Sequence, residues 1–204
     1  YRNKEFRKHQ FFACLQTTSY ALINPTILSS KTAGPMAGSW ATLNKLGRDG
    51  YRKIVEETQA ATEKLVAGVN AIEGLRVLGK PDMCLFSFAS DSVNLFQVAE
   101  EMGRRGWYVQ PQFSTPYSPY NLHLTVNHSS VGFTEALLAD LREAVSLVKK
   151  SDSHIDVETV REQISQLIAA DPEHARETIL AMGGVSGEGL PDSMVMINTV
   201  LECL

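Results

Sequence analysis

The segment from residue 75 to residue 149 constrains the fold most, because the spacing of its apolar residues alternates between that of strands and that of helices. Two of its stretches have the spacing of amphipathic helices, at 94–105 and 134–149. Four shorter apolar runs are typical of strands, at 75–79, 83–89, 107–110 and 121–126. The predicted order is β-β-α-β-β-α, which indicates an α+β layer with helices on one face of a short, mostly antiparallel sheet.

Helices are predicted on both sides of this layer. Before it, Ile54, Thr58, Ala61, Leu65, Val69 and Ile72 form the apolar stripe of a long helix over 51–72, which Gly74 ends. A shorter helix begins near Gly34-Pro35, and Gly47 and Gly50 interrupt it. After the layer, helices are expected at 157–169 and 172–182, followed by one short final helix.

These patterns divide the chain into three parts. Residues 1–50 form a connecting segment, 51–150 the α+β domain, and 151–204 a helical C-terminal extension. Residues 15–33 are rich in Ser and Thr and show no regular period, so we expect a long ordered loop there. The charged start and the absence of an initiator Met favour a piece of a longer protein.

The overall composition excludes several classes of protein. Apolar residues make up 44% of the 204 and the net charge is −4, which gives no sign of nucleic-acid binding. No run is long enough for a transmembrane helix, and the first residues lack the apolar core of a signal peptide. Three distant cysteines without a CxxC motif favour a reducing compartment, so we expect a cytoplasmic protein.

Several residue patterns resemble functional sites but have simpler interpretations. His123, Asn127 and His128 suggest a metal, yet strand periodicity places His123 opposite the apolar face and His128 beyond the strand end. A phosphate loop follows a strand, whereas the glycines at 183, 184, 187 and 189 follow a helix. The adjacent pairs Glu56-Glu57 and Glu100-Glu101 cannot share a helix face. We therefore assign no metal ligand and no catalytic residue.

The segment Ser29-Ser30-Lys31 is a candidate anion site. It lies just before the helix predicted to begin at Gly34-Pro35, and hydroxyls at a helix N-terminus favour anions. Serine and threonine also cap helices without any ligand, so this pattern leaves both interpretations open.

The segment 24–51, NPTILSSKTAGPMAGSWATLNKLGRDGY, resembles group II pyridoxal-phosphate-dependent decarboxylases and sphingosine-1-phosphate lyases. The family form reads S-P-T-x-x-G-S-R-x-G-x-x-x-A-x-W-A, with G-x-x-G-Y further on. Matching positions are Pro25, Thr26, Ser30, Gly34, Trp40, Ala41, Gly47, Gly50 and Tyr51. Ser29, Lys31 and Thr32 replace the usual Gly, Arg and Pro.

This resemblance implies the small C-terminal domain of a fold-type I enzyme, with a connecting segment. Its cofactor would be pyridoxal 5'-phosphate, and its substrate an amine or amino acid. The resemblance also implies that Ser30, with Ser29 beside it, reaches the cofactor phosphate across a homodimer interface. The stretch YRNKEFRKHQFF resembles the part that follows the cofactor-binding lysine. We therefore expect that lysine upstream of Tyr1, and no activity from these 204 residues alone.

The C-terminal end favours one branch of the family. ETILAMGGVSGEGLPDSMVMINTVLECL is similar to the lyase-type ending, which amino-acid decarboxylases usually lack. The lyase branch cleaves the Cα–Cβ bond of a phosphorylated long-chain amino alcohol, and the decarboxylase branch releases the carboxylate. Arg104 and Arg105 are weak candidates for binding a substrate carboxylate. A third alternative is a non-enzymatic α+β module that binds a partner through its basic first segment.

Overall fold

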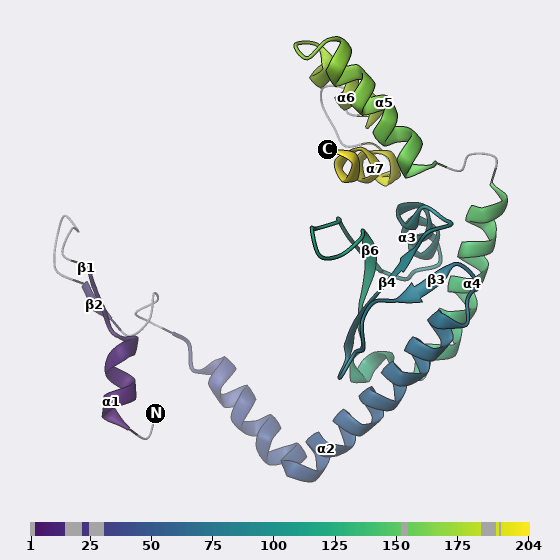
Figure 1. The fold of residues 1–204 in the computed structure, drawn as a ribbon. Coiled ribbons are helices and arrows are strands. Elements are labelled where there is room, and N and C mark those ends of the chain that lie inside the picture. The colour runs from purple at the N-terminus through teal and green to yellow at the C-terminus, as the bar shows by residue number, and fades with distance from the viewer. Residues whose placement is uncertain (1–2, 15–21, 25–30, 152–154, 185–190, 192) are drawn as a thin grey trace. The chain divides into compact units, whose positions relative to one another are not determined.

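The computed structural model describes residues 3–14, 22–24, 31–151, 155–184, 191 and 193–204 (Figure 1). It comprises two compact units, Tyr1–Tyr51 and Arg52–Leu204.

The first unit contains short elements and the beginning of a long helix. Helix α1 (Lys4–Arg7) and the 3-10 turn η1 (Lys8–Gln10) precede strands β1 (Phe12–Cys14) and β2 (Leu22–Asn24). The strands pair antiparallel, with Phe12 opposite Asn24. The prediction of a loop throughout 15–33 is therefore wrong at β2, because backbone pairing with β1 imposes a strand that the side-chain pattern does not indicate. Residues 15–21 and 25–30 lie outside the described part.

Helix α2 (Gly34–Asn70) bends at Gly47, as predicted, whereas the predicted interruption at Gly50 is wrong because Gly50 keeps helical backbone angles. Gly47 has φ 58° and ψ −170°, a backbone conformation that is strained for residues with a Cβ atom. The helix ends two residues before the predicted Ile72, and Gly74, with φ 90°, lies in the turn that follows. The stripe predicted after the bend is buried from Thr58 onwards, and Ile54 is half-buried.

The second unit contains the predicted β-β-α-β-β-α order around a four-stranded antiparallel sheet. Strands β3 (Leu75–Val77), β4 (Leu85–Ser90), β5 (Gln110–Gln112) and β6 (Asn121–Thr125) are arranged β3-β4-β6-β5. The strand predicted at 107–110 begins only at Gln110. It includes Pro111, which is tolerated because β5 is an edge strand and needs fewer backbone donors.

Three helices and the sheet share one apolar core. Helices α3 (Leu95–Arg104) and α4 (Thr134–Lys150) bury apolar residues together with the second part of α2, and the short 3-10 segment η2 (His128–Phe133) leads into α4. Phe88, Leu95, Met102 and Leu122 are fully buried in this core. The fold is therefore the predicted α+β domain.

The C-terminal extension packs around a second, smaller core. Helices α5 (Val157–Ala170), α6 (Ala175–Met182) and α7 (Val195–Cys203) bury Val160, Ile164, Ala175, Ile179 and Val200 together. Helix α6 begins three residues later than predicted, because the Asp171 carboxylate accepts a hydrogen bond from the His174 N–H and holds the preceding residues in a turn. Within the described residues, no helix is long and apolar enough to cross a bilayer.

Candidate functional site

The predicted anion-binding segment lies at the start of α2. Ser29 and Ser30 fall outside the described residues, so their side chains cannot be placed, whereas Lys31 is exposed. An α-helix leaves the N–H groups of its first turn without intrahelical partners, and here these belong to Gly34 and Met36. Two N–H donors and an ammonium group at the end of a long helix suit an anion.

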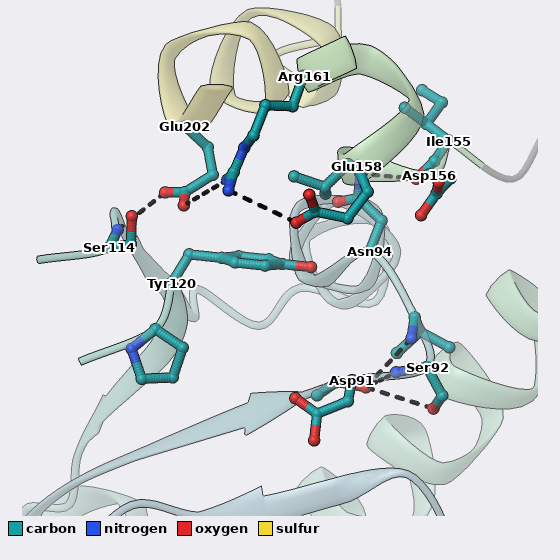
Figure 2. Close-up of a pocket in the computed structure, with 14 residues that line it drawn as sticks. Asp91, Ser92, Asn94, Ser114, Tyr120, Ile155, Asp156, Glu158, Arg161 and Glu202 are labelled. Atoms are coloured by element: carbon teal, nitrogen blue, oxygen red, sulfur yellow. Dashed lines mark hydrogen bonds and ion pairs between the residues drawn. The ribbon is translucent and has the colours of Figure 1, made fainter. Parts of the chain in front are cut away.

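A cavity of about 450 Å³ lies where the α+β layer meets the extension (Figure 2). Its walls come from the end of β4, the start of α3, the loop between β5 and β6, and helices α5 and α7. Polar residues that line it include Ser90, Asp91, Ser92, Asn94, Ser114, Tyr120, Asp156, Glu158, Arg161 and Glu202. Four carboxylates and one guanidinium line the cavity, so its lining is acidic, and two of the carboxylates, those of Glu158 and Glu202, point towards Arg161 (Figure 2).

Asn94 joins three elements at one edge of this cavity. Its side chain is the N-cap of α3 and accepts hydrogen bonds from the Phe96 and Gln97 N–H groups at 2.9 and 3.4 Å. Its amide nitrogen donates to the Ile155 carbonyl at 3.0 Å and to the Thr199 hydroxyl at 3.1 Å. Asn94 is 2% exposed, and these bonds satisfy both ends of its amide.

Glu202 joins α7 to the loop between β5 and β6. Its carboxylate accepts the Ser114 N–H at 2.8 Å and lies 3.6 Å from the Arg161 guanidinium, which also lies 3.6 Å from Glu158 (Figure 2). The Glu202 side chain is 1% exposed. A carboxylate this deeply buried needs such partners, because desolvation strongly disfavours an isolated charge.

Tyr120 stacks on Phe96 with ring centroids 5.3 Å apart. Burial, reinforced by the charge of Glu202, raises the pKa of Tyr120 to about 12, and a hydrogen bond with the Leu95 backbone opposes this shift. Phe113 also packs against Phe96, with ring centroids 6.0 Å apart, whereas Tyr117 is 97% exposed. None of the residues Asn94, Tyr120, Arg161 and Glu202 was among the site residues predicted from the sequence.

The structure places both histidines and two of the four glycines singled out in the sequence. His123 is half-buried on β6 between buried Leu122 and Leu124, and His128 lies 3.3 Å from the Glu57 carboxylate. Among the residues that the structure describes, no group of three or more His, Cys, Asp or Glu side chains has the arrangement of a metal site. Gly183 and Gly184 end α6, and Gly187 and Gly189 lie outside the described part.

Both candidate arginines on α3 already have carboxylate partners. Arg104 bonds to Glu100 at 3.0 Å and also to Glu101. Arg105 bonds to Glu101 at 2.9 Å, and this bond raises the pKa of Arg105 further. The two glutamates are thus ion-paired, and each of these arginines already has a carboxylate partner.

Comparisons with known proteins identify the relatives of this chain, although no family model matches it. Sphingosine-1-phosphate lyases from Oryza sativa subsp. japonica and Arabidopsis thaliana are 36% and 35% identical over 155 residues, or 76% of the chain. The solved sphingosine-1-phosphate lyase of Burkholderia pseudomallei has 30% identity and a TM-score of 0.62, covering 84% of the chain and 37% of that structure. The chain spans 28% of the length of the two plant relatives.

A more distant structure supports the same fold. Glutamate decarboxylase of Lactobacillus brevis has a TM-score of 0.61 at 18% identity, covering 76% of the chain and 37% of that structure. The fold is thus that of the small C-terminal domain of fold-type I pyridoxal-phosphate enzymes. The chain belongs to the family of sphingosine-1-phosphate lyases and group II decarboxylases, as a C-terminal portion.

Pyridoxal phosphate is the cofactor of this family, and the described residues suit its phosphate end. Its phosphate suits the N–H donors at the start of α2 and the nearby Lys31. Its aldehyde requires a lysine held in a protected site. All nine lysines of the chain are described, and all are exposed in this structure.

Proposed function

We propose that this chain is part of a pyridoxal-phosphate-dependent carbon–carbon lyase. Its substrate would be a phosphorylated long-chain amino alcohol, cleaved between Cα and Cβ to give a fatty aldehyde and phosphoethanolamine. The observation that supports this proposal is the similarity to sphingosine-1-phosphate lyases, which extends over three quarters of the chain. The tertiary fold of a solved lyase supports it independently.

The role of this chain is to hold the anionic end of the cofactor. The hydroxyls of Ser29 and Ser30 would donate hydrogen bonds to the phosphate, and the helix N-terminus at Gly34 and the Lys31 ammonium would balance its charge. When bound, pyridoxal phosphate supplies the electron sink that stabilises negative charge at the substrate Cα. The chain's residues fix the position of this cofactor and so the orientation of the scissile bond.

We infer that this site forms with a second subunit of a homodimer. Met36, Trp40 and Leu43 are spaced to share one side of α2 and are 75%, 69% and 58% exposed within their unit. Apolar side chains grouped in this way need cover from another protein surface, either the second subunit or the remainder of the enzyme. The cysteine usage is consistent with a cytoplasmic location.

A decarboxylase of the same family is the second candidate. The supporting observation is a probable L-tyrosine/L-aspartate decarboxylase of Methanosphaera stadtmanae, which is 27% identical over 107 residues and matches 51% of the chain. The plant lyases match more of the chain at higher identity, and Arg104 and Arg105 already pair with glutamates. The lyase is therefore the better supported function, and no observation favours the third alternative of a non-enzymatic module.

Product analysis of the full-length enzyme separates the two reactions. Incubation with a phosphorylated sphingoid base yields a fatty aldehyde if the enzyme is a lyase, whereas a decarboxylase releases carbon dioxide from an amino acid. Decarboxylation of amino acids without aldehyde production would contradict the proposed function.

Ser30→Ala tests the proposed phosphate contact in the same full-length enzyme. The loss of a charge-assisted hydrogen bond weakens cofactor binding by about tenfold, measured by retention during dialysis. Ser39→Ala is the matched control, because the Ser39 hydroxyl donates to the Pro35 carbonyl of its own helix at 2.9 Å. Equal retention by Ser30→Ala and wild type would show that Ser30 does not bind the phosphate.

A further inference from the structure

The junction between the α+β layer and the C-terminal extension is polar. The two parts bury separate apolar clusters, one around the sheet and one between α5, α6 and α7. In the described residues, a few hydrogen bonds join the two parts. On the side of the extension they involve α7 and the residues before α5. Hydrogen bonds require defined geometry, so they hold the extension in one orientation on the layer.

Helix α7 is anchored on its inner side. Thr199 is fully buried, and its hydroxyl donates to the Val195 carbonyl at 2.8 Å while accepting the Asn94 amide. Gln97 accepts the Ile155 N–H at 3.1 Å, which holds the chain that leads into α5. The position of α7 is thus fixed by the N-terminal turn of α3, which itself belongs to the main core.

Glu202 lies three residues after Thr199 and extends from α7 towards the loop formed by residues 113–120 (Figure 2). This loop carries four aromatic or proline residues between Phe113 and Pro119, and its backbone bonds include a local bridge between Thr115 and Ser118. Glu202 accepts the Ser114 N–H from 88 residues away in the sequence. A buried carboxylate that binds a backbone N–H forms a charge-assisted bond, which is stronger than a neutral one.

We propose that helix α7 holds the loop 113–120 in one conformation through the hydrogen bond that the Glu202 carboxylate accepts from the Ser114 N–H. Glu202 acts here as a positioning residue. Displacement of α7 breaks its hydrogen bond to Ser114, and loss of this bond lets the loop next to Phe113 change conformation. The hydrogen bond therefore links the C-terminal helix to a loop whose aromatic side chains Phe113 and Tyr117 are 44% and 97% exposed. It is independent of the proposed lyase function, since it depends only on contacts within residues 94–204.

Amide hydrogen exchange of the full chain measures directly how strongly Glu202 protects the loop 113–120. Glu202→Leu keeps much of the side-chain volume but removes the acceptor, whereas Glu202→Gln keeps a carbonyl oxygen that can accept the Ser114 N–H. Glu158→Gln is the matched control, because Glu158 also lies 3.6 Å from Arg161 and lines the same cavity but is not bonded to the loop.

We expect Glu202→Leu to increase exchange in peptides covering 112–118 by about tenfold, since a hydrogen bond to a charged group is lost. Peptides covering β4 and β6 keep their wild-type exchange, and so does the loop in Glu158→Gln. Glu202→Gln, which offers only a neutral acceptor, increases loop exchange less than Glu202→Leu does. Equal loop protection in Glu202→Leu and wild type would overturn the proposal. If Glu202→Leu unfolds α5–α7, a loop that remains protected beside the unfolded helices would overturn it as well.

Discussion

Gly68 of α2 packs directly against Leu138 of α4, with no room for a side chain between the two helices. A Cβ atom at Gly68 would lie 2.3 Å from Leu138 Cδ1 and 2.6 Å from Leu138 Cδ2. Leu138 is itself 2% exposed, so it has little freedom to move away. The glycine therefore sets how closely the two helices approach each other.

Gly68→Ala should destabilise the chain. Overpacking a core contact typically costs about 1–3 kcal/mol, and the better helix propensity of alanine returns about 1 kcal/mol. The net loss expected in urea unfolding is up to about 2 kcal/mol. Gly103→Ala on α3 is the control, because a Cβ atom there meets nothing within 4 Å and the change should be neutral or stabilising.

The origin of this loss can be checked with a second substitution. If steric overlap with Leu138 is the cause, the added methyl group costs less when Leu138→Ala has already opened space beside it. The double variant should then be more stable than the sum of the single effects predicts. Additive effects would show that Gly68 is required for another reason.

Replacing Asn94 should loosen the extension as well as α3. Asn94→Ala removes an N-cap, which costs about 0.5–2 kcal/mol, and leaves the carbonyl of half-buried Ile155 without its amide donor. The expected total loss of unfolding free energy is about 2–4 kcal/mol. Asn127→Ala provides a comparison, because Asn127 caps η2 from an exposed position, where the loss should be about 1 kcal/mol.

Tyr120 should make the stability of the chain depend on pH in the alkaline range. Its pKa is raised from the ordinary 10.0 to about 12, so the folded state retains the phenol proton more strongly than the unfolded state does. This contribution to stability is fully present below pH 10 and is lost as the pH rises through about 12. In Tyr120→Phe this part of the alkaline decline should be absent from unfolding curves.

The same residue offers a spectroscopic test of its neighbour. The Glu202 charge contributes to the raised pKa of Tyr120, but burial is the larger cause. Glu202→Gln should therefore lower the pKa of Tyr120 towards 10 without restoring it fully. The titration of Tyr120 is obtained by subtracting the ultraviolet absorbance of Tyr120→Phe from that of the parent. An unchanged titration would mean that Glu202 exerts no field at the phenol.

Sequence periodicity identified the elements whose burial repeats regularly. The stripe from Thr58 to Val69 and the alternation along β6 are both found in the structure, because a helix and a strand each bury one face at a fixed period. Strand β2 was missed because pairing with β1 depends on a backbone register that side chains do not encode. Strand β5 begins three residues later than predicted and includes Pro111, which an edge strand accommodates.

The polar junction was harder to predict than the core. Asn94 precedes an apolar period and is recognisable as an N-cap, but its bonds to Ile155 and Thr199 connect positions 61 and 105 residues apart. Glu202 is the one acidic residue in the final stretch MVMINTVLECL, which was a local sign of an unusual environment. Its partner at Ser114 follows only from the tertiary fold.

These 204 residues alone should not bind pyridoxal phosphate at a defined lysine. A lysine that reacts efficiently with an aldehyde at neutral pH needs a lowered pKa, which apolar burial or a neighbouring cation provides. Every lysine of the chain is exposed, and several have carboxylate or carbonyl partners, including Lys53 with Glu57, Lys64 with Glu135 and Lys149 with the Glu73 carbonyl. Borohydride trapping followed by peptide mapping should find weak labelling spread over many lysines, and no amine turnover. Stoichiometric labelling of a single lysine, abolished by its replacement with alanine, would place the reactive site within this chain and contradict the prediction.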